Sequence, residues 1–508
     1  MLTPEYLSAL PDAVVKLWSQ AEDDILRDVA RRIGSLDDLD PMTPTAQWQA
    51  WRLDQARLVR GDVTGTLAKY SGKTKAEIRR LLQDAGTQAL AADDAVYRAA
   101  GKSPAPVNDS PTLLNLLNAG YRQTLGTWQN LTATTARTVT GEFERAMDRA
   151  WLQVSSGAFD HKTAIARAVD DLAAGGLKAI TYPTGHRDTL EVAVRRCVLT
   201  GTNQTAAKLQ IARMDEMECE FVEVTAHEGA RPEHAVWQGK VYHRSGAVEL
   251  DGVKYEDFET ATGYGTGPGL CGWNCRHNFY PFFPGVSTRN YTDQRLAELA
   301  DPEAYALRQQ QRALERKVRD AKRRFIAAEA AGADTGKAAA RLKNARSELA
   351  QFLKENGLRQ DSSRERVQGF GYQQERTASA AEKAYTKSKN DAIMIENLRS
   401  AGNLPRTSKI HLPPAEMDMD SLSFDDKHIN GQRHHNITEE QAKHYIQNAA
   451  FSATVWGGQF ERYYGIDGVA YVDIRANSIR TAFGKAEFDE SLKNLVEEMK
   501  QNGLLGER

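Results

Sequence analysis

Five Cys and His side chains in the middle of the chain have the residue types of a metal site. Cys271 and Cys275 are followed closely by His277, and His227 and His234 lie further upstream. Thiolate sulfur and imidazole nitrogen are donors that suit tetrahedral Zn²⁺. The surrounding sequence is rich in Gly, Pro and aromatic residues, so a structural zinc would hold together a region with little regular secondary structure. The sequence therefore predicts a zinc site within residues 220–280.

The spacing of these residues leaves a second interpretation open. Cys271 and Cys275 are separated by three residues, whereas a Cys-x-x-Cys pair is the stronger zinc pattern. Buried cysteines also serve as small apolar side chains that bind no metal. In that interpretation the imidazoles bond to backbone groups, and the segment is an ordinary protein core.

A second group of polar side chains, near the C-terminus, has the types needed to cleave RNA without a metal. One group must take the 2′-OH proton, another must protonate the leaving 5′-oxygen, and cations must stabilise the phosphorane. Histidine serves both proton transfers near neutral pH, and Arg and Lys bind phosphate. The candidates are Lys427, His428, His435, Arg480, Thr481 and Lys485. Alternatively, they lie on the plain surface of a small structural domain.

Residues 308–324 form a basic run, with eight Lys and Arg side chains opposed only by Glu315 and Asp320. Such a run could contact the phosphates of DNA without reading its sequence. The simpler alternative is the solvated face of a helical hairpin. The whole chain has a formal net charge of -2, so any nucleic-acid contact must come from a local patch.

Helices are the elements expected to position most of these residues. Apolar residues recur at helical spacing through much of the first half, with breaks at Ser71-Gly72 and at residues 101–112. The expected helices span residues 11–33, 45–59, 75–90, 113–125, 134–157, 161–175 and 186–201. Residues 302–358 have the narrow apolar seam of an antiparallel helical hairpin, interrupted at residues 332–336.

The remaining segments predict a mixture of short strands and helices. After Cys219 the pattern changes to short β-type runs broken by Gly and Pro. A helix is expected over residues 378–400, and a last domain should contain helix 438–453, strands 468–474 and 478–483, and helix 488–501. Thr438 and Gln441 have the spacing of a capping box for the first of these helices. The fold class is therefore multidomain and mainly α, with a small, loop-rich α+β central domain and a C-terminal α+β domain.

With 508 residues, the chain is too long for one core and is expected to divide into several domains. We expect a helical scaffold (1–200), a Cys/His-containing core domain (201–300), a helical hairpin (301–358), a linker (359–420) and a C-terminal domain (421–508) that carries the candidate RNA-cleaving residues. No apolar run of about eighteen residues occurs, which predicts no membrane span. The first residues lack a basic start and an apolar core, so we expect synthesis in a cytoplasm with reduced cysteines.

Two segments of the middle region are distinctive. AHEGARPEHAVWQGKVY (226–242) and YGTGPGLCGWNCRHNFYPFFPGVS (264–287) resemble the phage minor capsid protein 2 family, which is related to the Mu-type head morphogenesis proteins. GTNQTAAKLQ (201–210) fits the same pattern. The resemblance implies a structural, portal-proximal component of a tailed-phage head, made in the host bacterial cytoplasm and packaged in the virion. It also implies portal and major capsid proteins as partners, and makes a ligand role for Cys275 and His277 plausible.

The C-terminal segment resembles a different family. KHINGQRHHNITEEQAKHYIQ and IRTAFGKAEFD look like polymorphic toxin type 50 domains, which belong to the barnase/EndoU/colicin/RelE-like ribonuclease fold. The resemblance implies helices followed by an antiparallel sheet, RNA as the substrate, and His428 as the leading catalytic residue with Arg480 and Thr481 across the cleft. The alternative is a purely structural virion protein whose C-terminal domain is an inactive interaction module.

Overall fold

The computed structural model of the protein describes residues 2–40, 43–174, 176–181, 187–299 and 301–504. The chain divides into two compact units, Met1–Glu382 and Lys383–Arg508, which are described separately. The first unit is mainly helical, and the second contains a six-stranded sheet with helices. The predicted fold class, mainly α with a C-terminal α+β domain, is confirmed.

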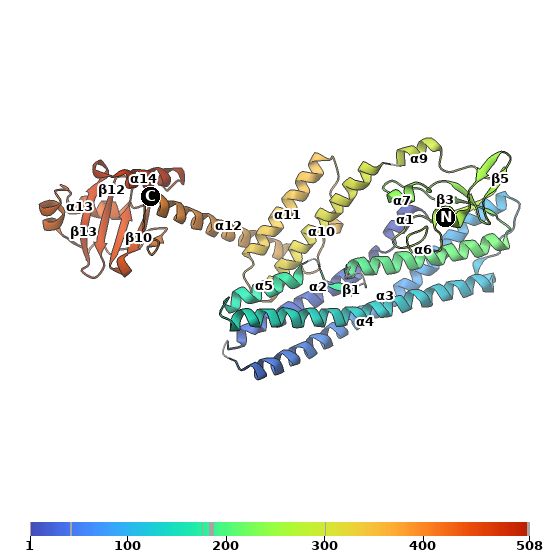
Figure 1. Cartoon of the computed structure of the whole chain (residues 1–508), viewed down its shortest axis with the longest axis horizontal. Helices are drawn as coiled ribbons and strands as arrows, with labels where there is room; N and C mark the ends of the chain where they lie inside the picture. The colour runs from blue at the N-terminus through green and yellow to red at the C-terminus, as the bar shows by residue number, and fades with distance from the viewer. Residues whose placement is uncertain (1, 41–42, 175, 182–186, 300, 505–508) are drawn as a thin grey trace. The chain divides into compact units, whose positions relative to one another are not determined.

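Long helices form the frame of the first unit. Helices α3, α4 and α6 run alongside one another and contact α2 and α5 (Figure 1). Tryptophans mark their contacts: Trp18 meets Trp128 edge to face, and Trp48 stacks on Trp151. The helices are α1 (Pro4–Ala9), α2 (Asp12–Gly34), α3 (Thr45–Ala99), α4 (Pro111–Ser155), α5 (His161–Ala173) and α6 (Leu190–Glu216).

These helices are longer than the sequence predicted. The segments 45–59 and 75–90 are parts of α3, and 113–125 and 134–157 are parts of α4. Gly72 lies inside α3 with open space around its Cα, so its cost of about 1 kcal/mol is borne by a helix that packs along most of its length. Gly175 and His186, the expected ends of two further helices, lie outside the described residues.

A small β-rich layer follows α6 in the chain. Strand β3 (Phe221–Val224) pairs antiparallel with both β4 (Val241–His243) and β7 (Phe279–Phe282), giving the order β4-β3-β7. A separate hairpin joins β5 (Val248–Leu250) to β6 (Val253–Tyr255), and β1 (Lys178–Thr181) pairs with β2 (Arg187–Thr189). Three short helices accompany these strands: α7 (Pro232–Ala235), α8 (Phe258–Thr262) and α9 (Asp293–Leu299).

The helical hairpin expected over residues 302–358 is present. It consists of α10 (Pro302–Ala330) and α11 (Gly336–Glu355), which pack through a core that includes Phe325, Leu342 and Leu349. Arg323 of α10 inserts among the helices and bonds to the buried carboxylates of Glu22 and Asp23. Burial raises the pKa of both carboxyls, whereas the Arg323 guanidinium lowers it. This buried ion cluster ties the hairpin to α2.

The segment treated above as a linker contains a helix, as expected over residues 378–400, and also a strand. Helix α12 (Tyr372–Ala401) begins in the first unit and ends in the second, and strand β8 (Lys409–His411) joins the sheet of the second unit. The sheet has the order β8-β10-β11-β12-β13-β9, antiparallel except for the β13–β9 pair. The further strands are β9 (Ser423–Phe424), β10 (Phe451–Val455), β11 (Phe460–Tyr464), β12 (Gly468–Asp473) and β13 (Ser478–Gly484).

Apolar side chains cover both faces of this sheet. One core joins the sheet to α12 and α14 (Glu490–Gln501), through residues such as Leu398, Phe451 and Leu495. The other joins it to α13 (Glu439–Gln447), which opens with the capping box expected from Thr438 and Gln441. The expected helix 438–453 is wrong beyond residue 447, because residues 451–453 begin β10, whose alternate side chains Phe451, Ala453 and Val455 face the core shared with α12 and α14.

A candidate metal centre and a candidate nuclease site

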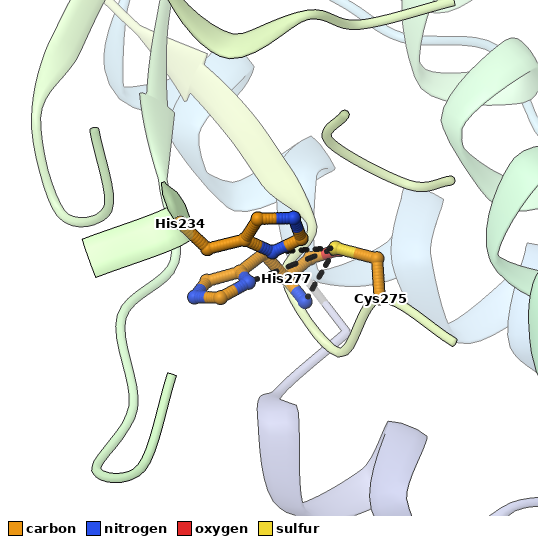
Figure 2. Close-up of side chains that lie close together, drawn as sticks. All are labelled: His234, Cys275 and His277. Atoms are coloured by element: carbon orange, nitrogen blue, oxygen red, sulfur yellow. Dashed lines mark hydrogen bonds between the residues drawn. The ribbon is translucent and has the colours of Figure 1, made fainter. Parts of the chain in front are cut away.

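Three of the five predicted metal ligands come together in the first unit. The ligand atoms of His234, Cys275 and His277 all lie within 4.8 Å of one another, and all three side chains are buried. His234 comes from the short helix α7, and the other two come from the loop that leads into β7. Figure 2 shows the sulfur of Cys275 in contact with both imidazoles, at 3.8 Å from His234 Nδ1 and 3.6 Å from His277 Nδ1.

Each imidazole is oriented by a hydrogen bond at Nε2, the ring nitrogen that faces away from the sulfur. His234 Nε2 donates to the carbonyl of Pro268 at 2.9 Å, and a carbonyl can only accept. His277 Nε2 lies 3.0 Å from Gln238 Oε1, which also accepts the backbone N–H of His227. Both Nε2 atoms therefore carry the proton, and both Nδ1 lone pairs point towards Cys275. Metal-binding histidines are commonly held in this way by a second group.

Burial keeps these imidazoles neutral. It lowers the pKa of His277 well below its usual range, and the neighbouring His227 and His234 lower it further. Burial likewise lowers the pKa of His234 and raises the pKa of the Cys275 thiol. Neutral imidazoles are the form that binds a metal, and a zinc ion would displace the thiol proton. The donor set of one sulfur and two nitrogens fits Zn²⁺.

The other two predicted ligands, His227 and Cys271, are not part of this trio. His227 Nδ1 bonds to the carbonyl of Glu228 at 2.9 Å, and its ring stacks on that of His277. Cys271 is buried and directs its thiol to the carbonyl of His277 at 3.6 Å. All four cysteines are free thiols. The trio therefore offers three protein ligands, and it lines a large cavity from which a fourth could come.

Two buried amides that support the trio were missed by the sequence analysis. Gln238 orients His277, as described above. Asn203, on α6, donates to the carbonyls of Cys275 and His277 at 3.2 and 2.9 Å and so fixes the loop that carries both ligands. Asn203 lies inside the quoted GTNQTAAKLQ segment, but a neutral amide in a helix gives no sign of its tertiary contacts.

In the second unit, the predicted catalytic residues lie along strand β13 and the segment that follows β9. This segment contains the π-helical turn η4 (Lys427–Gln432), which contacts β13. The buried side chains of Ile429 and Ile437 anchor the segment in the core beneath α13. His428 and His435 therefore sit on a loop whose position is fixed by apolar packing.

Near the start of β13, the Asp425 carboxylate contacts both the backbone of His428 and the side chain of Arg480. Its carboxylate accepts the backbone N–H of His428 at 3.0 Å and pairs with the Arg480 guanidinium. These contacts lower the pKa of Asp425. Arg480 is the additional residue of a β-bulge, since Ile479 pairs with Val472 and Thr481 with Tyr471. Bulges redirect side chains, and Arg480 is exposed here.

At the other end of β13, His435 is held by a carboxylate. Its Nδ1 lies 2.7 Å from Glu487 Oε2, and its ring stacks on Phe483. His428 Nδ1 is similarly held, 2.8 Å from Gln432 Oε1. Among the described residues neither Nε2 has a hydrogen-bond partner. Lys427 and Lys485 are exposed, and Thr481 is half-buried in the strand between the two histidines.

The basic run on α10 is largely paired within the first unit. Arg308, Lys317, Arg319, Arg323 and Arg324 form ion pairs with carboxylates of other segments or of α10 itself, and Lys322 donates to the carbonyl of Glu365. Arg312 and Arg316 have no hydrogen bond or ion pair among the described residues. Most of the run therefore holds the hairpin in place.

No helix in the described part of the chain is both long enough and apolar enough to cross a membrane.

Comparison with known proteins points to one family. The model of the phage minor capsid protein 2 family matches residues 2–354. A structural protein of Lactococcus phage LL-H is 28% identical over 197 residues, covering 37% of this chain and 51% of that protein. A structural protein of Lactococcus phage mv4 is 32% identical over 111 residues, covering 21% of this chain and 86% of that protein. The chain thus spans about half the length of the LL-H relative. No solved structure matches.

Proposed function

The chain belongs to the phage minor capsid protein 2 family, and we propose that it is a portal-proximal component of a tailed-phage head, made in the bacterial cytoplasm and packaged in the virion. The family match, which covers most of the first unit, carries this proposal. The portal and the major capsid protein are its proposed partners. The long helices α3, α4 and α6 support the proposal because they provide an extended, rigid surface on which other head subunits can dock.

The test is the composition and architecture of purified particles. The protein should be present in full heads, and a tagged copy should label the portal vertex in electron micrographs. It should also co-purify with portal subunits. Its absence from particles, together with no affinity for portal or shell subunits, would overturn the proposal.

Within the first unit, the trio of His234, Cys275 and His277 is proposed to bind one zinc ion that fixes the loop before β7. The observation that carries this is the orientation of both Nδ1 lone pairs towards Cys275. Metal analysis of the purified protein should find about one zinc per chain. Cys275→Ser should lose the metal, whereas Cys271→Ser, at a buried thiol outside the trio, should retain it. A folded wild-type protein that binds no zinc would end the idea.

The second unit is proposed to be a metal-independent ribonuclease. The carrying observation is that His428 and His435 are each held through Nδ1 while Nε2 has no hydrogen-bond partner among the described residues, with Arg480 beside one of them. One imidazole would accept the 2′-OH proton as the P–O2′ bond forms, and the other would protonate the 5′-oxygen as the P–O5′ bond breaks. Arg480 would stabilise the phosphorane, once substrate draws it from Asp425.

The full-length protein should cleave RNA in EDTA, and the product should carry a 2′,3′-cyclic phosphate. His428→Gln should abolish cleavage, whereas His444→Gln, at an exposed histidine on α13, should not. Expression of residues 383–508, which form a compact unit with their own core, should inhibit bacterial growth. No cleavage and no growth inhibition would favour the alternative, a purely structural virion protein whose C-terminal unit is an inactive interaction module.

A further inference from the structure

A large, strongly basic cavity lies within the first unit. Its volume is about 1790 Å³, and its lining comes from α2, α6, α10, the Cys/His loop and residues 361–370. Eleven Lys and Arg residues line it, against four Asp and Glu residues. The whole chain has a net charge of -2, so this excess of seven positive charges is a local feature.

The carboxylates in the cavity are already occupied. Asp12 pairs with Arg195, Glu191 with Arg319, and both Asp361 and Glu315 with Arg364. Arg196 pairs with Asp188, outside the cavity. Seven of the eleven cations then have no ion pair with a carboxylate among the described residues. Three of these seven, Arg231, Arg276 and Lys322, donate to backbone carbonyls, which do not neutralise their charge. A protein that gathers so many cations without carboxylate partners around one space lowers its own stability unless an anion occupies that space.

The cations that lack a carboxylate partner come from several separate elements. Arg312 and Arg316 lie one helical turn apart on α10, Arg276 lies on the Cys/His loop, and Lys16 and Arg366 approach from α2 and from the segment after η3 (Ser362–Glu365). Arg312 is half-buried, and burial together with the neighbouring Arg364 lowers its pKa. Cations from four elements can contact several phosphates at once, which a single exposed helix face cannot do.

The cavity also has an exposed aromatic side chain. Trp273 is 58% exposed, although it is large and apolar, and it follows directly on the tight turns of the glycine-rich loop. Its carbonyl accepts a hydrogen bond from Arg231, which lines the same cavity. Aromatic rings beside a basic groove are the usual arrangement for binding single-stranded nucleic acid, because any base can stack on the ring while the cations hold the backbone.

We propose that this cavity binds single-stranded nucleic acid, with its phosphates held by Arg276, Arg312 and Arg316 and a base stacked on Trp273. The site differs from the exposed helix face considered from the sequence, because most cations of the 308–324 run are paired and only Arg312 and Arg316 remain for a ligand. It is independent of the proposed ribonuclease, which lies in the other unit.

The test measures binding of a short fluorescent single-stranded DNA to the full-length protein. DNA lacks the 2′-OH, so the proposed ribonuclease cannot cleave it. The double variant Arg312→Gln/Arg316→Gln should weaken binding about tenfold or more at moderate salt, and should reduce the slope of log K against log salt by about 1.4. Lys317→Gln is the matched control, because Lys317 lies on the same helix and pairs with Glu348 outside the cavity. It should bind like the wild type.

Two further measurements distinguish nucleic acid from other anionic ligands of the cavity. Trp273→Ala should weaken DNA binding about tenfold and leave pyrophosphate binding unchanged, since only DNA carries bases that stack. Polyglutamate should compete poorly with the DNA. Equal binding by wild type and the double variant, pyrophosphate binding without DNA binding, or efficient competition by polyglutamate would each overturn the proposal; the last would point to an acidic protein segment instead.

Discussion

The two histidine sites of this protein use the same side chain in opposite environments. In the first unit, His234 and His277 are 2% and 1% exposed, and both are fixed by acceptors on Nε2. In the second unit, the His435 side chain is 14% exposed, Glu487 holds its Nδ1, and its Nε2 has no partner among the described residues. Burial favours the neutral imidazole that coordinates a metal. A carboxylate and access to solvent favour an imidazole that exchanges protons.

The environment of each histidine in this protein decides its chemistry. The first site is built by buried amides and carbonyls that select one tautomer. The second depends on a loop anchored by apolar side chains and on a carboxylate at its rim. Loss of a supporting group should therefore reduce metal affinity in one case and catalytic rate in the other.

The largest expected effect is on the proposed proton transfer. His435→Gln removes the imidazole but keeps a polar side chain of similar length. Cleavage of RNA should fall about 10²- to 10⁴-fold, as expected when a general acid or base is lost. Zinc content should not change, because the trio lies in the other unit. A variant that keeps full activity would break the assignment of His435 to catalysis.

The loop that carries His428 and His435 should depend on one buried isoleucine to hold its position. Ile429 is fully buried, so Ile429→Ala should destabilise residues 383–508 by about 2–5 kcal/mol. Urea unfolding of that unit measures the change. Ile474→Ala, at a 45% exposed position, is the control and should alter stability by less than about 0.5 kcal/mol. Similar losses for the two variants would show that the loop is not anchored by apolar packing.

In the first unit, replacing Gln238 tests whether the orientation of His277 controls zinc affinity. Gln238→Leu takes away the acceptor that fixes His277 Nε2, and zinc affinity should fall about 10- to 100-fold. Competition with a coloured chelator measures it. Thr262→Val removes a different buried hydrogen bond, to the carbonyl of Phe258, and should leave zinc affinity unchanged. If both variants lose zinc equally, general destabilisation and not imidazole orientation explains the effect.

The smallest effect is expected at Asp425. The backbone N–H of His428 and the Arg480 guanidinium hold its pKa below the ordinary value, so its stabilising contribution is present above about pH 4 and is lost as the pH falls through the lower, folded-state pKa. Asp425→Asn should lower the melting temperature of residues 383–508 by a few degrees at most, since exposed ion pairs contribute about 1 kcal/mol or less. The difference from wild type should close in acid. A difference that persists at pH 2 would contradict this assignment.

Periodic patterns in the sequence predicted the elements well where one face of a helix is buried. The hairpin α10–α11 and the helix α2 follow their apolar spacing closely. The breaks inside α3 and α4 were wrong, because polar and glycine residues on an exposed face do not end a helix that packs on its other face. Strand β10 was missed because its first residues were assigned to the preceding helix, although FSATV alternates between apolar and polar residues. Strand β11 was missed because FERYY does not alternate in that way.

By itself, the sequence determined the residue types at both sites and the mainly helical class of the protein, because side-chain chemistry and apolar periodicity are local properties. Only the tertiary structure decided that His234, Cys275 and His277 meet while His227 and Cys271 stay apart. It also decided that most cations of α10 are paired and that Arg312 and Arg316 face a cavity. These outcomes depend on contacts between segments far apart in the chain, and no local spacing encodes the distance between them.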